Sequence, residues 1–383
     1  MLSVFLLVFI FGHSIPGLKY LMNNANRFSH IDSLRGIAAL LVIWLHVSEV
    51  FVHISPETLA QGSALYDVAR AVDVGRIGVV VFFAISGFVI CRSLNGNIIE
   101  GSKKFLIRRL LRLYPAFWVS IVLGLFSLWW LFDKPFSWHI IAANITMLPE
   151  LSGEPPIIGL YWTLETELVF YLLCWLLFVN RNLNNPLILF LISTFLAFFF
   201  VVAKLFFMPP ELRSSLKVMP YNLAIMFWGG FFRYWYDDKK ALIILATRKI
   251  QLQWLLYLLT MIVLIPAVAA LIKGNSEQND TLIRLGSSYI LGLAIFIGGN
   301  LVFKIKNQFM AWTGTVSYSL YLVHPVIFYS LFWYLKNKAP YWLMTFHLSV
   351  YIGFTMVFTM VLSAIIYYSV EKPAIDFAHK LTR

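Results

Sequence analysis

The sequence predicts an all-α protein, a polytopic membrane bundle of about ten transmembrane helices. Of its 383 residues 60% are hydrophobic and 13% charged, whereas a soluble domain carries roughly 25% charged residues. Several apolar runs exceed the roughly 18 residues that indicate a spanning helix. The 34 Phe and 13 Trp residues fit lipid-facing surfaces and interfacial aromatic belts.

Ten spans are expected, and their boundaries are predicted to within a few residues. They cover residues 33–53, 76–95, 113–133, 160–179, 186–208, 219–236, 252–272, 283–303, 313–335 and 344–369. The apolar run over 138–148 is too short to span and is expected to re-enter or to lie at the interface. No fixed repeat and no low-complexity segment is found.

The distribution of charge orients the chain. The segments expected inside hold 19 Lys and Arg residues, and those expected outside hold 9. By the positive-inside rule both termini of this multi-pass protein are expected to be cytoplasmic. This bias accounts for most of the net charge of +12, so no nucleic-acid partner is implied. The two cysteines, Cys91 and Cys174, fall in expected membrane helices, which argues against a disulfide framework.

The chain is interpreted as three parts. Residues 1–27 form an N-terminal extension without a clear signal peptide, since no basic n-region and no small-residue cleavage site is evident. The extension is expected to be dispensable, and translation could start at Met1 or at Met22. Residues 28–375 form the transmembrane domain, and 376–383 form a short cytoplasmic tail. No further soluble domain is expected, because the last span ends close to the last residue.

The first span carries an arginine and a histidine on one face. Arg35 and His46 are eleven residues apart, which in a helix means about three turns and roughly 16 Å along the axis. An arginine near a membrane helix centre costs about 2.5–3.5 kcal/mol, so such residues usually mark function. Arg35 could also be a snorkelling anchor, and His46 a buried histidine bonded to a neighbouring helix. Because the two side chains share one face of the helix, a joint functional role is favoured over two separate structural ones.

A basic segment precedes the third span. Residues 103–115 read KKFLIRRLLRLYP, in which Arg108, Arg109 and Arg112 lie within about one helical turn of one another. One interpretation is a basic loop that fixes topology. The other is a phosphate clamp, because guanidinium groups match phosphate oxygens. The residues alone do not separate the two interpretations.

Polar residues also enter the second and fourth spans. Ser86 and Gly87 interrupt an apolar helix, and close helix packing through small residues is the favoured interpretation. Glu165 and Glu167 open the fourth span beside Trp162. They could remain solvated, but a buried glutamate could act as an acid or base or bind sugar hydroxyls. Because they are two residues apart, at most one readily faces a site.

The ninth span contains a histidine near its middle. His324 precedes Pro325, follows Tyr318 by six residues, and lies three residues after Tyr321 on the same face. A histidine before a proline can simply satisfy freed backbone carbonyls. A role in a polar site is the other interpretation, and both stay open.

Taken together these stretches resemble the membrane acyltransferase 3 family, the bacterial integral-membrane O-acyltransferases. The matching segments run through the chain in the family's order. They are LRGIAALLVIWLH (34–46), FFAISGFVI (82–90), RRLLRLYP (108–115), YWTLETELVFY (161–171), SYSLYLVHP (317–325) and VEKP (370–373). Each segment alone is weak evidence for the family, but the six segments together are specific to it. Thr163 stands where the family often has Ser, and Leu168 and Val169 where it often has a second Glu or Gln. The chain resembles the standalone members, which lack a C-terminal hydrolase-like domain.

The resemblance implies an activity. Acetyl-coenzyme A is the expected donor, supplied from the cytoplasm, and the acceptor is a carbohydrate hydroxyl at the extracytoplasmic face. Arg35, Arg109 and Arg112 would hold the donor's phosphates or orient its thioester. His46 would be the general base on the acceptor hydroxyl or an acyl-carrying nucleophile.

The remaining expected site residues follow from the same resemblance. The family's catalytic glutamate is carried over to Glu167 rather than Glu165. Supporting or substrate-binding roles are expected for Ser86, Trp162, Tyr318 and His324. No metal and no permanently bound cofactor is expected, and the partners are the bilayer, the acyl-CoA and a surface or lipid-linked carbohydrate.

Two other function classes compete with this prediction. A secondary transporter or a flippase for a lipid-linked saccharide would also place polar residues inside a bundle, but the paired broken helices typical of transporters are not found. A structural scaffold would not account for titratable groups inside the spans.

Overall fold

The computed structural model describes residues 29–209, 211–245 and 248–382. The extension expected over residues 1–27 lies outside these ranges. Contacts within the chain divide it into two units. Unit 1 comprises Met1–Gly78, Ala116–Lys134 and Ala294–Lys372, and unit 2 comprises Val79–Pro115, Pro135–Leu293 and Pro373–Arg383.

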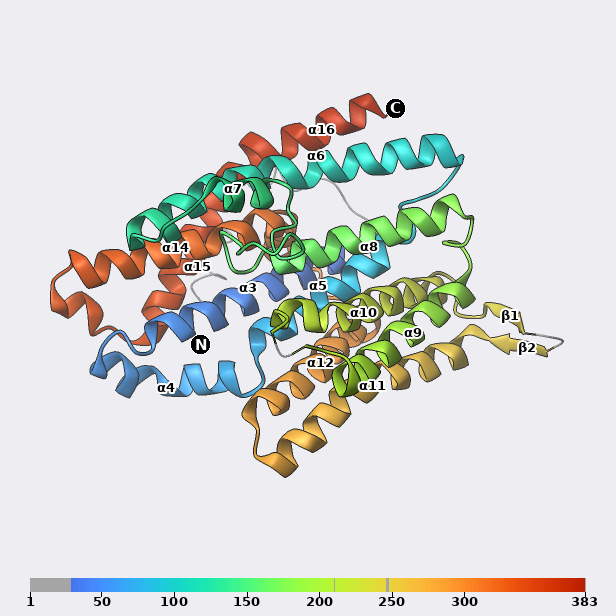
Figure 1. Cartoon of the computed structure of the whole chain (residues 1–383), viewed down its shortest axis with the longest axis horizontal. Helices are drawn as coiled ribbons and strands as arrows, with labels where there is room; N and C mark the ends of the chain where they lie inside the picture. The colour runs from blue at the N-terminus through green and yellow to red at the C-terminus, as the bar shows by residue number, and fades with distance from the viewer. Residues whose placement is uncertain (1–28, 210, 246–247, 383) are drawn as a thin grey trace. The chain divides into compact units, whose positions relative to one another are not determined.

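Unit 1 is built around the first described helix, α3. Its elements are α3 (Ser29–Phe51), α4 (Pro56–Ala71), η1 (Leu125–Trp129), η2 (Trp130–Phe132), η3 (Gly299–Phe303), α13 (Gln308–Thr315), α14 (Ser317–Asn337), η4 (Tyr341–Met344), α15 (Leu348–Ile366) and η5 (Tyr367–Glu371). Helices α14 and α15 pack on each other and on α3 (Figure 1). Three of these segments, η1, η3 and η5, are π-helical turns, a form often found at functional sites.

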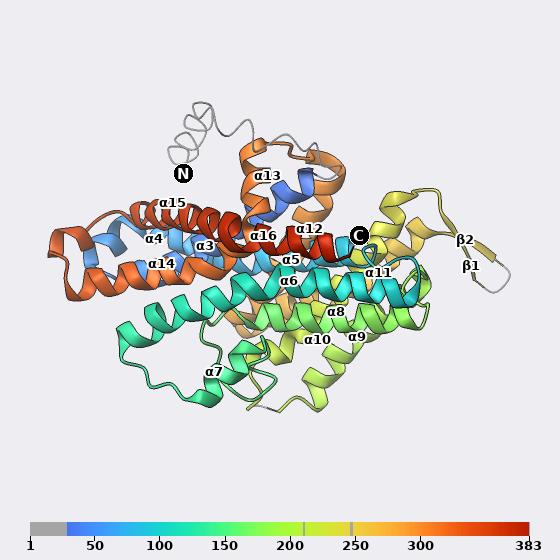
Figure 2. The ribbon, with the colours of Figure 1, turned by 90° about the horizontal axis from the view of Figure 1, so that it is seen from above.

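Unit 2 holds most of the remaining helices. Its elements are α7 (Trp138–Ile145), α8 (Trp162–Val179), α9 (Pro186–Phe206), α10 (Ser214–Asp237), β1 (Leu242–Leu245), β2 (Arg248–Gln251), α11 (Leu252–Glu277) and α16 (Lys372–Leu381). Helices α5 (Val74–Ile90), α6 (Ile98–Gly124) and α12 (Asp280–Gly298) contribute residues to both units, and the first residue of α16, Lys372, belongs to unit 1. The strands form an antiparallel hairpin with Leu242 opposite Gln251, beyond the ends of α10 and α11 (Figure 2).

The structure confirms an all-α polytopic membrane protein. In the described part of the chain, eight helices are long and apolar enough to cross a membrane. A ninth span arises if α13 and α14, which are bent by 76° at their junction, are taken together. Helix α7, at the short apolar run, has only 8 residues and is not among them. The expected ninth span, 313–335, therefore contains a bend of 76° between Thr315 and Ser317.

Helix α10 lies where the sixth of the ten spans was expected, at residues 219–236. It is a 24-residue helix, but it is not among the eight apolar spans. Its side chains from Tyr221 to Phe232 are all buried. A helix enclosed by protein does not need to present a uniformly apolar face to lipid. Its polar residues can then be satisfied inside the unit.

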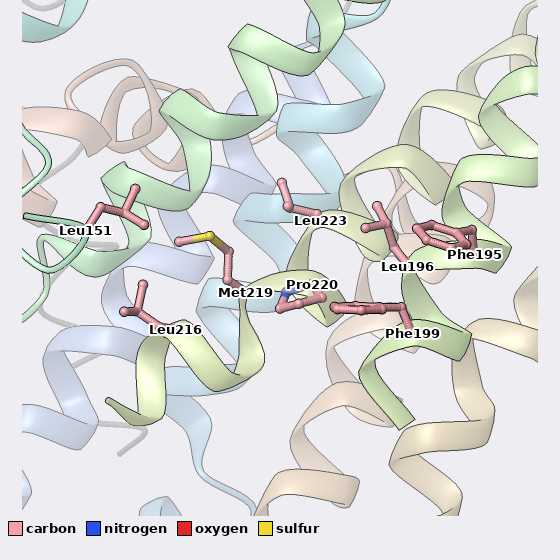
Figure 3. Close-up of a pocket in the computed structure, with 8 residues that line it drawn as sticks. All are labelled: Leu151, Phe195, Leu196, Phe199, Leu216, Met219, Pro220 and Leu223. Carbon is pink, nitrogen blue, oxygen red and sulfur yellow. The ribbon is translucent and has the colours of Figure 1, made fainter. Parts of the chain in front are cut away.

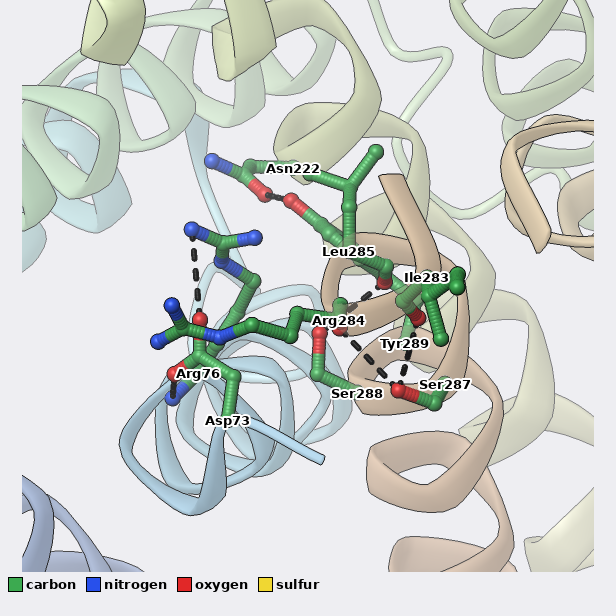
Figure 4. A network of polar contacts seen from close by, with 9 residues as sticks. All are labelled: Asp73, Arg76, Asn222, Ile283, Arg284, Leu285, Ser287, Ser288 and Tyr289. Atoms are coloured by element: carbon green, nitrogen blue, oxygen red, sulfur yellow. Dashed lines mark hydrogen bonds and ion pairs between the residues drawn. The ribbon is translucent and has the colours of Figure 1, made fainter. Parts of the chain in front are cut away.

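Asn222 is one of the polar residues buried in α10. Its Oδ1 accepts a hydrogen bond of 2.6 Å from the Tyr289 hydroxyl of α12, between two buried side chains (Figure 4). The neighbouring Tyr221 stacks on Tyr289 with 4.5 Å between ring centroids, and its hydroxyl donates to the Val263 carbonyl at 2.8 Å. A buried hydroxyl is costly unless it is paired, so the bonds made by the two tyrosine hydroxyls stabilise α10 against α11 and α12.

Close backbone approach holds α3 against α13. A Cβ at Gly314 would lie 1.8 Å from the Asp32 carbonyl oxygen, and one at Gly36 would lie 2.5 Å from the Met310 carbonyl oxygen. Only glycine fits at such contacts. Figure 2 shows α13 beside the N-terminal part of α3. These two glycines fix the start of the helix that carries Arg35 and His46.

An apolar cavity of about 320 Å³ lies on unit 2 between α9 and α10 (Figure 3). Its lining is aromatic and aliphatic, including Phe195, Phe199, Met219 and Leu223. No titratable side chain lines it. The chemistry expected of this protein therefore has to be sought elsewhere.

Candidate functional site

Two histidines from distant parts of the chain meet in unit 1. His46 lies on α3 and His324 on α14, and the Nδ1 of His46 is 3.0 Å from the Nε2 of His324. The rings are nearly parallel, at 3°, with centroids 5.3 Å apart. The side chain of His324 is completely buried, and that of His46 is half-buried. Phe328 contacts both rings, with centroids 6.5 Å from His46 and 5.9 Å from His324.

Pro325 determines how His324 is protonated. A residue at this position of a helix would normally donate its N–H to the carbonyl four residues earlier, which is that of Tyr321, but proline has no N–H. The Nδ1 of His324 lies 2.8 Å from this Tyr321 oxygen. Because a carbonyl can only accept, Nδ1 of His324 carries the proton and donates. The Nε2 of neutral His324 is therefore an acceptor.

The same reasoning determines which ring nitrogen of His46 carries the proton. Since His324 offers only a lone pair at Nε2, the hydrogen bond between the rings requires a proton on the Nδ1 of His46. Neutral His46 then has an unprotonated Nε2. A histidine whose Nδ1–H is held by a partner and whose Nε2 carries the lone pair is oriented for proton abstraction or nucleophilic attack.

The two interpretations of His324 in the sequence are therefore connected. The side chain does satisfy the carbonyl freed by Pro325, and that bond turns its other nitrogen toward His46. The ring of Tyr321 also packs on His324, with centroids 5.8 Å apart. Sequence spacing places Tyr321 and His324 on one face, but it cannot show that His46, 278 residues away, is the partner.

Arg35 lies on the same continuous helix as His46, as expected. Its guanidinium is 3.3 Å from a carboxylate oxygen of Asp32, and the two side chains are 19% and 23% exposed. A partly exposed pair of this kind holds the arginine in place at modest energetic gain. The role of Arg35 toward a donor stays a prediction.

A second polar cluster forms in unit 2 around Glu167. The Oε1 of Glu167 accepts hydrogen bonds from the Ser86 hydroxyl of α5, at 3.2 Å, and from the Tyr171 hydroxyl of α8. The guanidinium of Arg109 lies over the Tyr171 ring, with 5.5 Å from Cζ to the centroid, and near the Phe105 ring at 5.7 Å. Three expected site residues, Ser86, Arg109 and Glu167, thus belong to one cluster.

Tyr171 was not expected from the sequence. Its spacing of four residues from Glu167 could have predicted the contact, because side chains four apart on a helix are neighbours.

Gly87, which follows Ser86 in the chain, has the packing role that the sequence favoured. A Cβ there would lie 1.7 Å from the Met226 carbonyl oxygen of α10. Ser86 and Gly87 therefore act differently, one in the polar cluster and one in helix packing.

The other two arginines of the basic segment, Arg108 and Arg112, have surroundings different from those of Arg109. Arg108 donates from Nε to the Thr382 hydroxyl at 2.8 Å, which ties α6 to the end of α16. Arg112, one turn further along α6, is half-buried. Arg108 thus has a structural contact, while donor binding by Arg109 and Arg112 stays a prediction.

Glu165 and Glu167 point to different partners, as their spacing predicts. Glu165 is completely buried, and its Oε1 accepts a 2.6 Å hydrogen bond from the backbone N–H of Glu150. The carboxylate of Glu150 in turn accepts from the Ser215 hydroxyl. Glu165 is therefore not solvated. Its bond to Glu150 fastens the loop before α8 to the start of that helix, and the bond from Ser215 to Glu150 ties the same loop to the start of α10.

The last two expected site residues are aromatic. Trp162 begins α8 and meets the Phe83 ring edge-on, with centroids 6.3 Å apart. Tyr318 is half-buried near the start of α14, six residues and roughly 9 Å along the axis before His324. Beside it the Ser319 hydroxyl donates to the buried carboxylate of Glu371 at 2.7 Å. That bond links the SYSLYLVHP and VEKP segments.

Comparison with known proteins gives one match. The acyltransferase 3 family model, described as an acyltransferase domain, matches residues 28–368. No curated protein and no solved structure matches the chain.

Proposed function

Because the chain belongs to the acyltransferase 3 family of membrane acyltransferases, we propose that it is an O-acyltransferase for carbohydrates. It moves an acyl group, most simply acetyl, from a cytoplasmic acyl-CoA to a sugar hydroxyl at the extracytoplasmic face of the bacterial inner membrane. The observation that carries the proposal is the bond between His46 and His324, which leaves Nε2 of His46 as the basic nitrogen.

In the proposed reaction the Nε2 of His46 accepts the proton of the acceptor hydroxyl as the oxygen attacks the thioester carbonyl. The C–O bond forms, the C–S bond breaks, and the imidazolium of His46 returns the proton to the departing thiolate of coenzyme A. His324 keeps accepting from the Nδ1–H of His46 throughout, so the ring stays oriented. A positioned general base typically contributes about 10² to 10⁴ in rate.

The nucleophilic alternative uses the same atom. If Nε2 of His46 attacks the thioester first, an acyl-imidazole forms and the sugar hydroxyl then displaces it. Both routes need the tautomer that His324 imposes. General-base catalysis is the one we propose, since it needs no covalent acyl-protein and the oriented nitrogen suffices for it.

The remaining expected residues take binding roles in this proposal. Arg35 and the pair Arg109 and Arg112 bind the donor, because guanidinium groups match phosphate oxygens. Glu167 acts on the acceptor side, supported by its hydrogen bonds from Ser86 and Tyr171. Trp162 and Tyr318 offer aromatic surface to a sugar. The competing function, transport of a lipid-linked saccharide, would not need an oriented basic nitrogen.

The sidedness of the reaction tests function and topology together. Purified protein with a protease-cleavable tag after Arg383 is reconstituted in proteoliposomes, and labelled acetyl-CoA is supplied on one side only. We expect transfer of label to a carbohydrate acceptor when the donor is on the side of the tag, since the charge bias of 19 to 9 puts that end inside. Saccharide movement without acyl transfer would favour the transporter, and transfer from the opposite side would contradict the orientation.

Replacing Arg109 and Arg112 together with Gln tests their donor role. We expect the affinity for acetyl-CoA to fall by about tenfold, the equivalent of 1.4 kcal/mol, and the effect of added salt on binding to shrink. Binding of the labelled donor to the purified protein is the measurement. Arg108→Gln is the matched control, because its guanidinium is engaged with Thr382. Equal donor affinity in the double variant and the wild type would leave these arginines a role in topology alone.

A further inference from the structure

Beyond His46, the same side of α3 carries a carboxylate. Glu49 follows His46 by three residues, roughly 4.5 Å along the helix axis, so the two side chains are neighbours on the helix surface. Glu49 is exposed and His46 is half-buried. Val47 and Ser48, between them in the chain, are completely buried. The packing of α3 therefore leaves the two titratable side chains accessible, and the reaction proposed above gives Glu49 no role.

Helix α14 runs beside this part of α3, and the two helices point in the same direction. Three contacts between α14 and residues 46–54 show this. The pairs in contact are, in order, His46 with His324, Phe51 with Phe332, and Ile54 with Lys336. Each step forward along α3 is thus a step forward along α14. Between the first two pairs, Glu49 is level with Phe328 and Tyr329.

Tyr329 is held in place by aromatic neighbours at this level. Its ring packs on Phe328 with centroids 4.5 Å apart and meets the Phe132 ring of η2 edge-on at 6.0 Å. Phe328 in turn contacts the His46 ring, with centroids 6.5 Å apart. The charge of Glu49 acts on the Tyr329 hydroxyl. A carboxylate, a phenolic hydroxyl and an aromatic ring therefore gather just beyond the proposed general base.

These groups match the hydrogen bonds that a sugar can make. An ionised carboxylate only accepts hydrogen bonds, whereas a tyrosine hydroxyl both donates and accepts, so the pair can satisfy a sugar hydroxyl in both directions. We propose that Glu49 and Tyr329 form an acceptor subsite, which binds a second hydroxyl of the sugar while Nε2 of His46 takes the proton of the reacting one. The inference rests on the proposed function and deepens it, since it names residues that select a polyhydroxylated acceptor over water.

The position of the subsite along α3 fits the expected direction of approach. Arg35 precedes His46 by eleven residues and is expected near the cytoplasmic end, whereas Glu49 follows His46 and lies three residues from the last residue of the helix. The donor and the acceptor would thus reach His46 from opposite ends of α3. An acceptor arriving from the extracytoplasmic side would pass Glu49 before it meets the histidine.

Steady-state kinetics of the full-length protein test the subsite. The acceptor probe is surface glycan released from bacterial cells that lack the gene, and the donor is labelled acetyl-CoA. The test variants are Glu49→Gln, which keeps an oxygen acceptor but removes the charge, and Tyr329→Phe. The matched control is Glu57→Gln, an exposed carboxylate of α4 in the same unit that also accepts from a tyrosine hydroxyl, that of Tyr341, at 2.9 Å.

We expect Glu49→Gln to raise the KM for the glycan by about tenfold, because bonds to an ionised carboxylate are roughly twice as strong as neutral ones. Tyr329→Phe should raise it less, and the KM for acetyl-CoA should change little in either variant. At low glycan concentration the label should shift from glycan to acetate formed by hydrolysis, since water does not use the subsite. The control should match the wild type in each measurement.

Each contrary result has a distinct meaning. An unchanged glycan KM in Glu49→Gln would make Glu49 an ordinary solvated carboxylate and overturn the subsite. So would equal losses of transfer and hydrolysis at unchanged glycan KM, because Glu49 would then act on His46 rather than on the sugar. A similar rise of the glycan KM in Glu57→Gln would reduce the effect to surface charge.

The test also separates the subsite from the proposed function. If the wild type transfers no acyl group to the glycan, the proposed function is wrong and the subsite is wrong with it. If the wild type transfers acyl groups and Glu49→Gln does so with the same glycan KM, the proposed function stands and only the subsite is wrong.

Discussion

Replacing His46 with alanine is expected to reduce acyl transfer by about 10² to 10⁴, or to abolish it, with little change in the amount of folded protein. The variant removes the only nitrogen that the bond to His324 leaves basic. Alanine is a strong helix former, so α3 should persist. Initial rates of transfer from labelled acetyl-CoA measure the effect, and size-exclusion profiles in detergent report folding.

A nearby histidine provides the control. His53 is exposed, lies seven residues after His46, and contacts the Tyr66 ring with 5.9 Å between centroids. His53→Ala should transfer acyl groups like the wild type. Near-normal transfer by His46→Ala would contradict the central assignment, and His324 would be the next candidate. Rapid quenching with labelled donor and no acceptor separates the roles, because an acyl-protein accumulates only if His46 is a nucleophile.

The second large effect is expected at His324. His324→Leu should lower kcat by about 10² to 10³ with a smaller change in the KM for the donor, because it releases the orientation and tautomer of His46 without touching substrate. His324→Gln should recover part of the rate, since its amide oxygen can accept from the Nδ1–H of His46. Steady-state kinetics of both variants measure these effects.

A double variant distinguishes positioning from mere packing. If the two histidines act as a unit, His46→Ala with His324→Leu should be no slower than His46→Ala alone, because the effects of such residues are strongly non-additive. Independent, multiplying losses would mean that His324 only fills the core. Because the His324 side chain is completely buried, thermal unfolding of each variant checks that the protein remains folded.

Much of the architecture could be predicted from local pattern. The length and apolarity of the runs predicted an all-α membrane protein, and the short run at 138–148 corresponds to the 8-residue α7. Arg35 and His46 were placed on one helix by spacing, and α3 is continuous over both. The α10 helix was predicted as one more span, but its enclosure by protein rather than lipid depends on contacts that no local pattern contains.

For the candidate site, helical spacing could predict which side chains share a face of one helix, but not which side chains meet across helices. The opposite directions of Glu165 and Glu167 follow from their spacing on a helix. By contrast, the hydrogen bonds from Ser86 and Tyr171 to Glu167 depend on how α5 and α8 pack. From the sequence, Ser86 and Gly87 were both expected to allow close helix packing. In the structure Gly87 has that role, whereas Ser86 donates a hydrogen bond to Glu167.

The sequence by itself determined that His324 precedes a proline, which leaves the Tyr321 carbonyl without its usual donor. Only the tertiary structure decided what this means, since it brings α14 against α3 and places Nε2 of His324 3.0 Å from Nδ1 of His46. Helical periodicity is a local property and reaches a few turns at most. A contact across 278 residues is decided by which helix faces pack together, as glycines such as Gly36 and Gly314 do for α3 and α13.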